Sequence, residues 1–163
     1  KFHVVRYVTW ALENVRKRIQ KLMHPSKRKY FKRSRRLLLT HKEKLNQEGL
    51  DALELMLLQS QDLAVAYHLK ELFYDFMKSQ NRNEASQKLK FFILSTQASG
   101  LKEFDACLTM LGNWSKYILN AFDCPYSNGF TEGTNNKIKV IKRNAYGYRN
   151  FENFRNRILL SSS

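Results

Sequence analysis

The sequence predicts a mainly α-helical fold. Apolar residues recur at steps of three and four through most of the 163-residue chain, which is the period of an amphipathic helix. Only two prolines and six glycines interrupt that pattern. Apolar residues make up 43% of the chain and aromatic residues 13%, which indicates a folded chain with a buried core. We expect on the order of six or seven helices, because helical periods dominate and strand signals are few.

The first predicted helix runs from Phe2 to Met23. His24-Pro25 ends it, because proline disfavours a helical conformation in the residue before it. The apolar stripe consists of Val4, Val5, Val8, Ala11, Leu12, Val15, Ile19 and Leu22. The charged residues Arg6, Glu13, Arg16, Lys17 and Lys21 fall largely off that stripe.

The most basic segment follows, from residue 26 to residue 44. Its candidate phosphate contacts are Lys27, Arg28, Lys29, Lys32, Arg33, Arg35 and Arg36. Cations of this kind contact phosphates without reading a base sequence. The aromatic residues Tyr30 and Phe31 allow two interpretations, stacking on unpaired bases or packing inward with Leu37 and Leu38. A strand near Arg36–Leu39 is a second open point, with helix or coil favoured because a lone strand lacks neighbours.

Capping residues predict where the remaining helices begin and end. The expected helix starts are Asn46, Ser60 or Asp62, Asn83, Ser127-Asn128 and Asn150, and Gly100 is expected to close a helix as a C′ residue. A long apolar stripe predicts one helix over 101–122. The last predicted helix has Phe151, Phe154, Ile158 and Leu159 buried.

Charge and motif content narrow the class of protein. The net charge of +15 divides into +12 over residues 1–50, −2 over 51–123 and +5 over 124–163. Basic ends of this kind indicate a polyanionic partner, most simply nucleic acid, although a solubilising surface is the alternative. The sequence contains no glycine-rich phosphate loop, and Cys107 and Cys124 have no metal-ligand spacing, which is typical of reduced thiols in an intracellular protein. No apolar run reaches the ~20 residues of a membrane span.

One stretch, residues 127–143, carries two helical faces. Thr134, Ile138, Ile141 and Ala145 form an apolar packing face at helical spacing. Glu132, Asn136, Lys139 and Arg143 form the other face. A carboxylate there can hold a divalent metal while the cations hold phosphates. The alternative is a solvated, capped helix in which the early glutamate only favours the helix dipole.

The same stretch resembles a known family. Ser127-Asn128-Gly129-Phe130-Thr131-Glu132-Gly133-Thr134-Asn135-Asn136-Lys137-Ile138-Lys139, together with residues 144–155, is similar to the C-terminal end of bacterial insertion-sequence transposases of the DDE type, ISL-three family. The opening residues 1–6 resemble the segment that follows the second catalytic aspartate in that family. The middle, residues 45–120, matches only in its helical character.

The resemblance implies a mechanism and a site. It makes Glu132 the third catalytic carboxylate and a ligand of Mg²⁺ or Mn²⁺, in a parent enzyme that cuts and joins DNA strands at transposon ends by two-metal phosphoryl transfer. It places the two aspartates, and the main sheet of an RNase H-like core, before Lys1. The chain begins with Lys rather than Met, so we expect a piece of a longer protein. We expect this piece alone to be inactive and to hold no metal.

The expected organisation has three parts. Residues 1–44 form a basic helical segment, 45–123 a helical insertion, and 124–163 the C-terminal core helices with the glutamate motif. The candidate DNA contacts of the last part are Lys137, Lys139, Lys142, Arg143, Arg149 and Arg155. The expected partner is DNA, with a homo-oligomer on DNA as an option, in the bacterial cytoplasm at the nucleoid. The alternatives are a non-enzymatic basic helical DNA- or RNA-binding module and a helical interaction domain whose charge is incidental.

Overall fold

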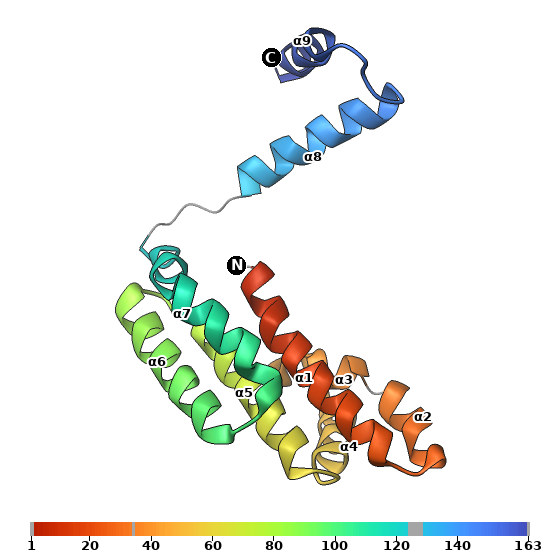
Figure 1. Ribbon diagram of the computed structural model, residues 1–163, viewed down its shortest axis with the longest axis vertical. Coiled ribbons are helices and arrows are strands. Elements are labelled where there is room, and N and C mark those ends of the chain that lie inside the picture. Colours follow the sequence, from red (N-terminus) through yellow and green to blue (C-terminus); the bar gives the residue numbers. More distant parts are fainter. Residues whose placement is uncertain (1, 34, 124–128, 163) are drawn as a thin grey trace. The chain divides into compact units, whose positions relative to one another are not determined.

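The computed structural model confirms the mainly α fold (Figure 1). It describes residues 2–33, 35–123 and 129–162, and this part of the chain contains no strand. The α-helices are α1 Phe2–Leu22, α2 Pro25–Arg33, α3 Arg35–Leu39, α4 Gln47–Leu57, α5 Gln61–Met77, α6 Arg82–Ser99, α7 Asp105–Asn120, α8 Gly129–Asn144 and α9 Phe151–Ser162. Two short 3-10 helices, η1 Lys42–Lys44 and η2 Lys102–Phe104, lie between them.

The described residues therefore form more helices than the sequence predicts. The difference lies mainly in the basic segment, which folds as the separate helices α2 and α3. Pro25 is the first residue of α2, a position where its missing N–H costs no intrahelical hydrogen bond. Residues Arg36–Leu39 are helical, so helix is correct there and the strand is not.

The chain divides into two compact units, Lys1–Cys124 and Pro125–Ser163. In the first unit α5 packs against both α1 and α6, and α7 packs against α6 and α1 (Figure 1). Its largest fully buried side chains are Phe31, Lys70, Phe73, Phe76, Phe92, Phe104, Leu12, Leu38, Met56, Leu63, Leu69 and Leu111. The boundaries expected for functional parts at residues 44 and 123 stay predictions.

Local caps fix where the helices of the first unit begin and end. The side chain of Asn46 accepts a hydrogen bond from the backbone N–H of Gly49, and that of Ser60 accepts one from Leu63, so both caps are confirmed. Gly100 closes α6 in the left-handed conformation, with φ 64°, which glycine adopts without strain. The expected start at Asn83 is wrong, because Asn81 caps α6 two residues earlier through the N–H of Glu84.

A buried lysine fastens the basic segment to the core. Lys70 of α5 has no exposed surface, and its ammonium donates to the carbonyls of Leu38 at 3.0 Å and Thr40 at 2.7 Å. The same group pairs with Glu71 at 2.5 Å and lies 3.9 Å from the centre of the Tyr67 ring. Burial lowers the pKa of Lys70, and the Glu71 pair opposes that shift. A cation at these carbonyls complements the negative end of the α3 dipole.

The second unit consists of α8, α9 and the turn between them. Tyr146 at φ 52° and Gly147 at φ 97° are both in the left-handed region. The N–H of Gly147 donates to the carbonyl of Lys142, and that of Tyr146 to Arg143, each at 3.0 Å, which is the Schellman arrangement. Tyr146 and Gly147 therefore end α8 in a turn.

Asn150 starts α9 as predicted, because its side-chain oxygen accepts the N–H groups of Glu152 at 2.8 Å and Asn153 at 3.3 Å. No described side chain of this unit is buried, however. Phe154 and Ile158 are half-buried, but Phe151 is 73% exposed and Leu159 56% exposed, so their predicted burial is wrong. Two helices cover each other along one face only, and the other apolar positions stay in water.

Two smaller expectations concern cysteine and membranes. Cys107 is a buried free thiol, and burial raises its pKa to about 12, so it is not a reactive thiolate at neutral pH. Cys124 lies outside the described residues. None of the described helices is long and apolar enough to cross a membrane.

Candidate nucleic-acid interface

The described part of the 127–143 stretch belongs to α8. Glu132 lies in its first turn and is exposed, as are Asn136, Lys139 and Arg143 on the same face. The opposite face is half-buried at Thr134, Ile138 and Ile141. The two-face prediction therefore holds along the helix, except that Ala145 lies beyond its end and is exposed. The expected caps Ser127 and Asn128 lie outside the described residues.

The carboxylate of Glu132 has no hydrogen bond or ion pair to any other described residue. By contrast, Glu152, the other acid of this unit, lies 3.5 Å from Arg155. Glu132 is thus a solvent-facing carboxylate at the positive end of a helix, flanked further along by cations. Such a group can serve as one oxygen ligand of a divalent metal.

The cations of the second unit divide by their partners. Lys137 donates to the carbonyl of Ser161, and Arg155 pairs with Glu152. Among the described residues no ion-pair partner is present for the other exposed cations of this unit, which are Lys139, Lys142, Arg143, Arg149 and Arg157. Exposed cations of this kind suit contact with phosphate oxygens.

The basic segment of the first unit divides in the same way. Arg28 closes the end of α1 by donating to the carbonyls of Met23 at 2.9 Å and Lys21 at 2.7 Å. The other exposed cations of this segment that form no ion pair with a described residue are Lys27, Lys29, Lys32, Arg36, Lys42 and Lys44. The side chain of Arg33 lies outside the description. Phe31 is 1% exposed, so for this residue packing is correct and base stacking is not.

A buried ion pair underlies this surface. Glu13 and Arg16 are 7% and 4% exposed and form a two-point pair at 2.7 and 2.9 Å. Arg35 of α3 joins them, with its Nε 3.3 Å from Glu13 Oε1. Burial pushes the pKa of Glu13 up, but the hydrogen bond and charge of Arg16, with the charges of Arg35 and Lys17, outweigh it and lower the pKa. Sequence reasoning placed Glu13 and Arg16 off the packing stripe, because it does not show that α2 and α3 cover that side of α1.

Glu13 also forms part of the lining of a groove between α1 and α3 that the sequence analysis missed. The groove has a volume of about 550 Å³ and is lined by Arg6, Tyr7, Trp10 and Arg35, among others. Trp10 is 58% exposed and Tyr7 40%. The available signal was the spacing of Arg6, Tyr7 and Trp10, which places all three on one face of α1 opposite its apolar stripe.

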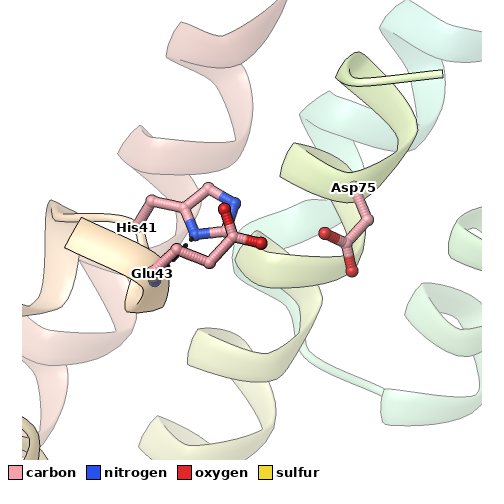
Figure 2. A group of neighbouring side chains, drawn as sticks. All are labelled: His41, Glu43 and Asp75. Carbon is pink, nitrogen blue, oxygen red and sulfur yellow. Dashed lines mark hydrogen bonds between the residues drawn. The ribbon is translucent and has the colours of Figure 1, made fainter. Parts of the chain in front are cut away.

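A second cluster combines metal-ligand types. The ligand atoms of His41, Glu43 and Asp75 lie within 4.8 Å of one another, where η1 meets α5 (Figure 2). His41 Nδ1 already lies 3.1 Å from Glu71, and the carboxylate of Glu43 already contacts the ammonium of Lys78. A cation here would compete with that ammonium. The contacts present hold η1 on α5, and this is the role the geometry supports.

The fold and the surface indicate the class of protein: a helical protein with exposed cations and, on α8, a carboxylate with no partner among the described residues. A family model for transposases of the DDE ISL-three type matches residues 1–158. The chain belongs to this transposase family. No solved structure matches it significantly.

Two curated relatives extend this finding. The chain is 30% identical over 156 residues to the transposase for insertion sequence element IS1001 of Bordetella parapertussis, covering 94% of this chain and 38% of that protein. It is 36% identical over 111 residues to a protein named ATP-dependent protease from Lactococcus lactis subsp. lactis, covering 68% of this chain and 34% of that protein. The chain thus spans little more than a third of the length of either relative.

Proposed function

We propose that this chain is part of a DNA transposase that cuts and joins strands by phosphoryl transfer, with Glu132 as one of the carboxylates that hold the divalent metals. The observation that carries the proposal is Glu132 itself. It is exposed, has no partner among the described residues, and stands in the family motif within the matched residues 1–158. Divalent ions, when bound, would activate the attacking hydroxyl and stabilise the leaving oxygen.

The residues present fit one ligand position rather than a complete centre. A carboxylate oxygen is the ligand type that Mg²⁺ prefers, but the ion dehydrates reluctantly and is held through more than one anionic group. In the described part of the second unit the only other acid, Glu152, is paired with Arg155. The remaining ligands belong, in this proposal, to aspartates preceding Lys1. The chain alone should then show no metal-dependent nicking.

The exposed cations supply the second element of the proposal, which is DNA binding. Lys27, Lys29, Lys32 and Arg36 face solvent in the first unit, and Lys139, Lys142, Arg143 and Arg149 in the second. Each phosphate that they neutralise should contribute about −0.9 to the slope of log K against log salt. Binding without this salt dependence, or no binding at low salt, would contradict it.

The decisive substitution is Glu132→Gln in the full-length protein, which keeps the shape and removes the charge. We expect strand cleavage to be abolished while DNA affinity stays within twofold, because the phosphate contacts come from other residues. Glu152→Gln is the matched control, since it also removes an exposed acid from the first turn of a helix in the same unit. If Glu132 only favours the helix dipole, its substitution costs about 0.3–1 kcal/mol of stability and cleavage continues at full rate.

A non-enzymatic DNA- or RNA-binding module remains the second candidate, because the exposed cations alone support it. It predicts salt-dependent binding in which Glu132→Gln changes nothing in any assay of the full-length protein. The name of the Lactococcus relative is not transferred to this chain, since residues 1–163 contain no glycine-rich phosphate loop that would support ATP binding.

A further inference from the structure

The groove between α1 and α3 combines two kinds of recognition chemistry. Tyr7 and Trp10 are one turn apart on α1 and keep 40% and 58% of their surface exposed. Neither residue belongs to the apolar stripe that fills the core, where Val8 and Leu12 are both 0% exposed. Two solvent-exposed aromatic rings that line a groove of about 550 Å³ offer flat surfaces for a planar ligand.

The charges of the groove favour an anion. Arg6 lies one turn from Trp10 on α1, and Arg35 reaches in from α3, each within the lining of the same groove. The single carboxylate of the lining, Glu13, is already paired with Arg16 and Arg35. The lining thus carries two guanidinium groups against one carboxylate, and that carboxylate is also paired with the buried Arg16, so the net charge of the groove is positive. An arginine fork matches phosphate oxygens with two parallel hydrogen bonds.

Buried contacts beneath the groove fix the positions of its charged side chains. Glu13 and Arg16 are more than nine-tenths buried, and Arg16 additionally donates to Gln20 at 2.6 Å and to the carbonyl of Phe31 at 3.3 Å. These contacts join α1 to α2, while Glu13 holds Arg35 of α3 in place at 3.3 Å. Arg35 is therefore positioned before a ligand binds, which reduces the conformational entropy lost on binding.

We propose that this groove holds an unpaired nucleotide of a DNA strand, with its base on Trp10 and Tyr7 and its phosphate on Arg6 and Arg35. Every base has a π-face, but inside a duplex both faces are covered by the neighbouring base pairs, so an unpaired base is far more accessible for stacking on a protein ring. The inference rests on the proposed function, since it specifies the form of DNA that this surface selects. It assigns a role to Arg6, Tyr7 and Trp10, which the cation pattern alone does not.

The chain offers a matched control for the stacking residue. Trp114 of α7 is 57% exposed and lies beside Tyr117, with ring centres 5.6 Å apart. The two tryptophans are almost equally exposed, and each lies three residues from a tyrosine, but α7 contains no arginine. A general effect of removing an exposed tryptophan would be equal at both sites. A nucleotide site would respond only at Trp10.

The experiment measures the affinity of the 163-residue chain for an oligothymidine strand and for a duplex of equal length. We expect Trp10→Ala to weaken single-strand binding roughly 5- to 150-fold, the range of one lost stacked base, and duplex binding less than twofold. Trp114→Ala should change neither. Equal losses on both forms of DNA, or no loss on the single strand, would overturn the proposal.

A fluorescence measurement covers the case in which the Trp10 variant folds poorly. Trp114→Phe leaves Trp10 as the sole tryptophan, and its emission should be quenched by the oligothymidine strand but not by the duplex. Unchanged emission at saturating strand would overturn the groove assignment. Thymidine monophosphate is the third ligand. If it quenches the emission at the same concentrations as the oligothymidine strand, the groove is a free-nucleotide site and the proposal is overturned.

The two proposals fail differently. If the chain binds neither form of DNA, the proposed function and the groove assignment both fail. If it binds DNA with the expected salt dependence but Trp10 and Trp114 variants behave alike, only the groove assignment fails. Arg6→Gln adds a check on the phosphate, since it should weaken single-strand binding several-fold while leaving the buried Glu13–Arg16 pair intact.

Discussion

The two compact units of this chain use the same helical sequence patterns with different results. In Lys1–Cys124, amphipathic helices surround α5, and side chains such as Phe73 and Phe92 lose all contact with water. In Pro125–Ser163, α8 and α9 are equally amphipathic, yet no described side chain is buried. Periodicity predicts a helix in both places, but only the number of neighbours decides whether its apolar face stabilises anything.

The residues that stabilise the fold and the proposed metal ligand lie in different units. The first unit contains the apolar core, the buried Glu13–Arg16 pair and the buried Lys70. The second carries the proposed metal ligand Glu132 on a helix pair without such support. We expect the first unit to set the global free energy of unfolding, while the second opens with little cost.

The strongest test replaces one phenylalanine in each unit. Phe73 is 0% exposed, with its ring centre 5.0 Å from that of Phe92, whereas Phe151 is 73% exposed. Phe73→Ala should lower the free energy of unfolding by about 3–5 kcal/mol through lost burial and a cavity. Phe151→Ala should change it by less than about 0.5 kcal/mol, as surface substitutions do. Denaturant unfolding followed by circular dichroism measures both, and similar losses would remove the contrast between the units.

Ion pairs at the same helical spacing give a second test. Glu13–Arg16 is buried at 2.7 Å, and Glu152–Arg155 is exposed at 3.5 Å. Glu13→Gln should cost about 1–3 kcal/mol at pH 7, because Arg16 loses its charged partner in a buried site. Glu152→Gln should cost less than about 0.5 kcal/mol.

The pH dependence of the same variant follows from the lowered pKa of Glu13. A carboxyl whose folded pKa is lowered contributes stability that is present above its ordinary value of 4.5 and is lost as the pH falls through the folded pKa. The stability of the unsubstituted chain should therefore fall as the pH drops below 4.5. Glu13→Gln should flatten that fall. A profile as steep in the Glu13 variant would show that other carboxylates cause the acid sensitivity.

The smallest expected effects come from two asparagine caps. Asn81 caps α6 at 2.9 Å, and Asn150 caps α9 at 2.8 Å. Asn81→Ala should lower the global free energy of unfolding by about 1 kcal/mol. Asn150→Ala should leave that value unchanged and instead speed hydrogen exchange of the α9 amides. A global loss from the Asn150 variant would mean that the second unit unfolds together with the first.

The sequence by itself determined what depends on residues close together in the chain. The helical periods, the caps at Asn46, Ser60 and Asn150, and the turn at Tyr146-Gly147 follow from local sterics and hydrogen bonds. The glutamate motif around Glu132 is likewise contiguous in the sequence, so the family can be identified without the structure. The one cap that was misplaced, at α6, lies where two asparagines stand two residues apart and either can accept a first-turn N–H.

The tertiary structure alone decided which residues meet from distant positions. Nothing near Glu13 in the sequence shows that Arg35 will approach it at 3.3 Å, or that Lys70 will close the end of α3 from α5. The exposure of Trp10, and its place beside Arg35 in one groove, depend in the same way on how α1 and α3 pack. Helix periodicity fixes the face on which a side chain lies, but only packing fixes what covers that face, because burial is a property of contacts between elements.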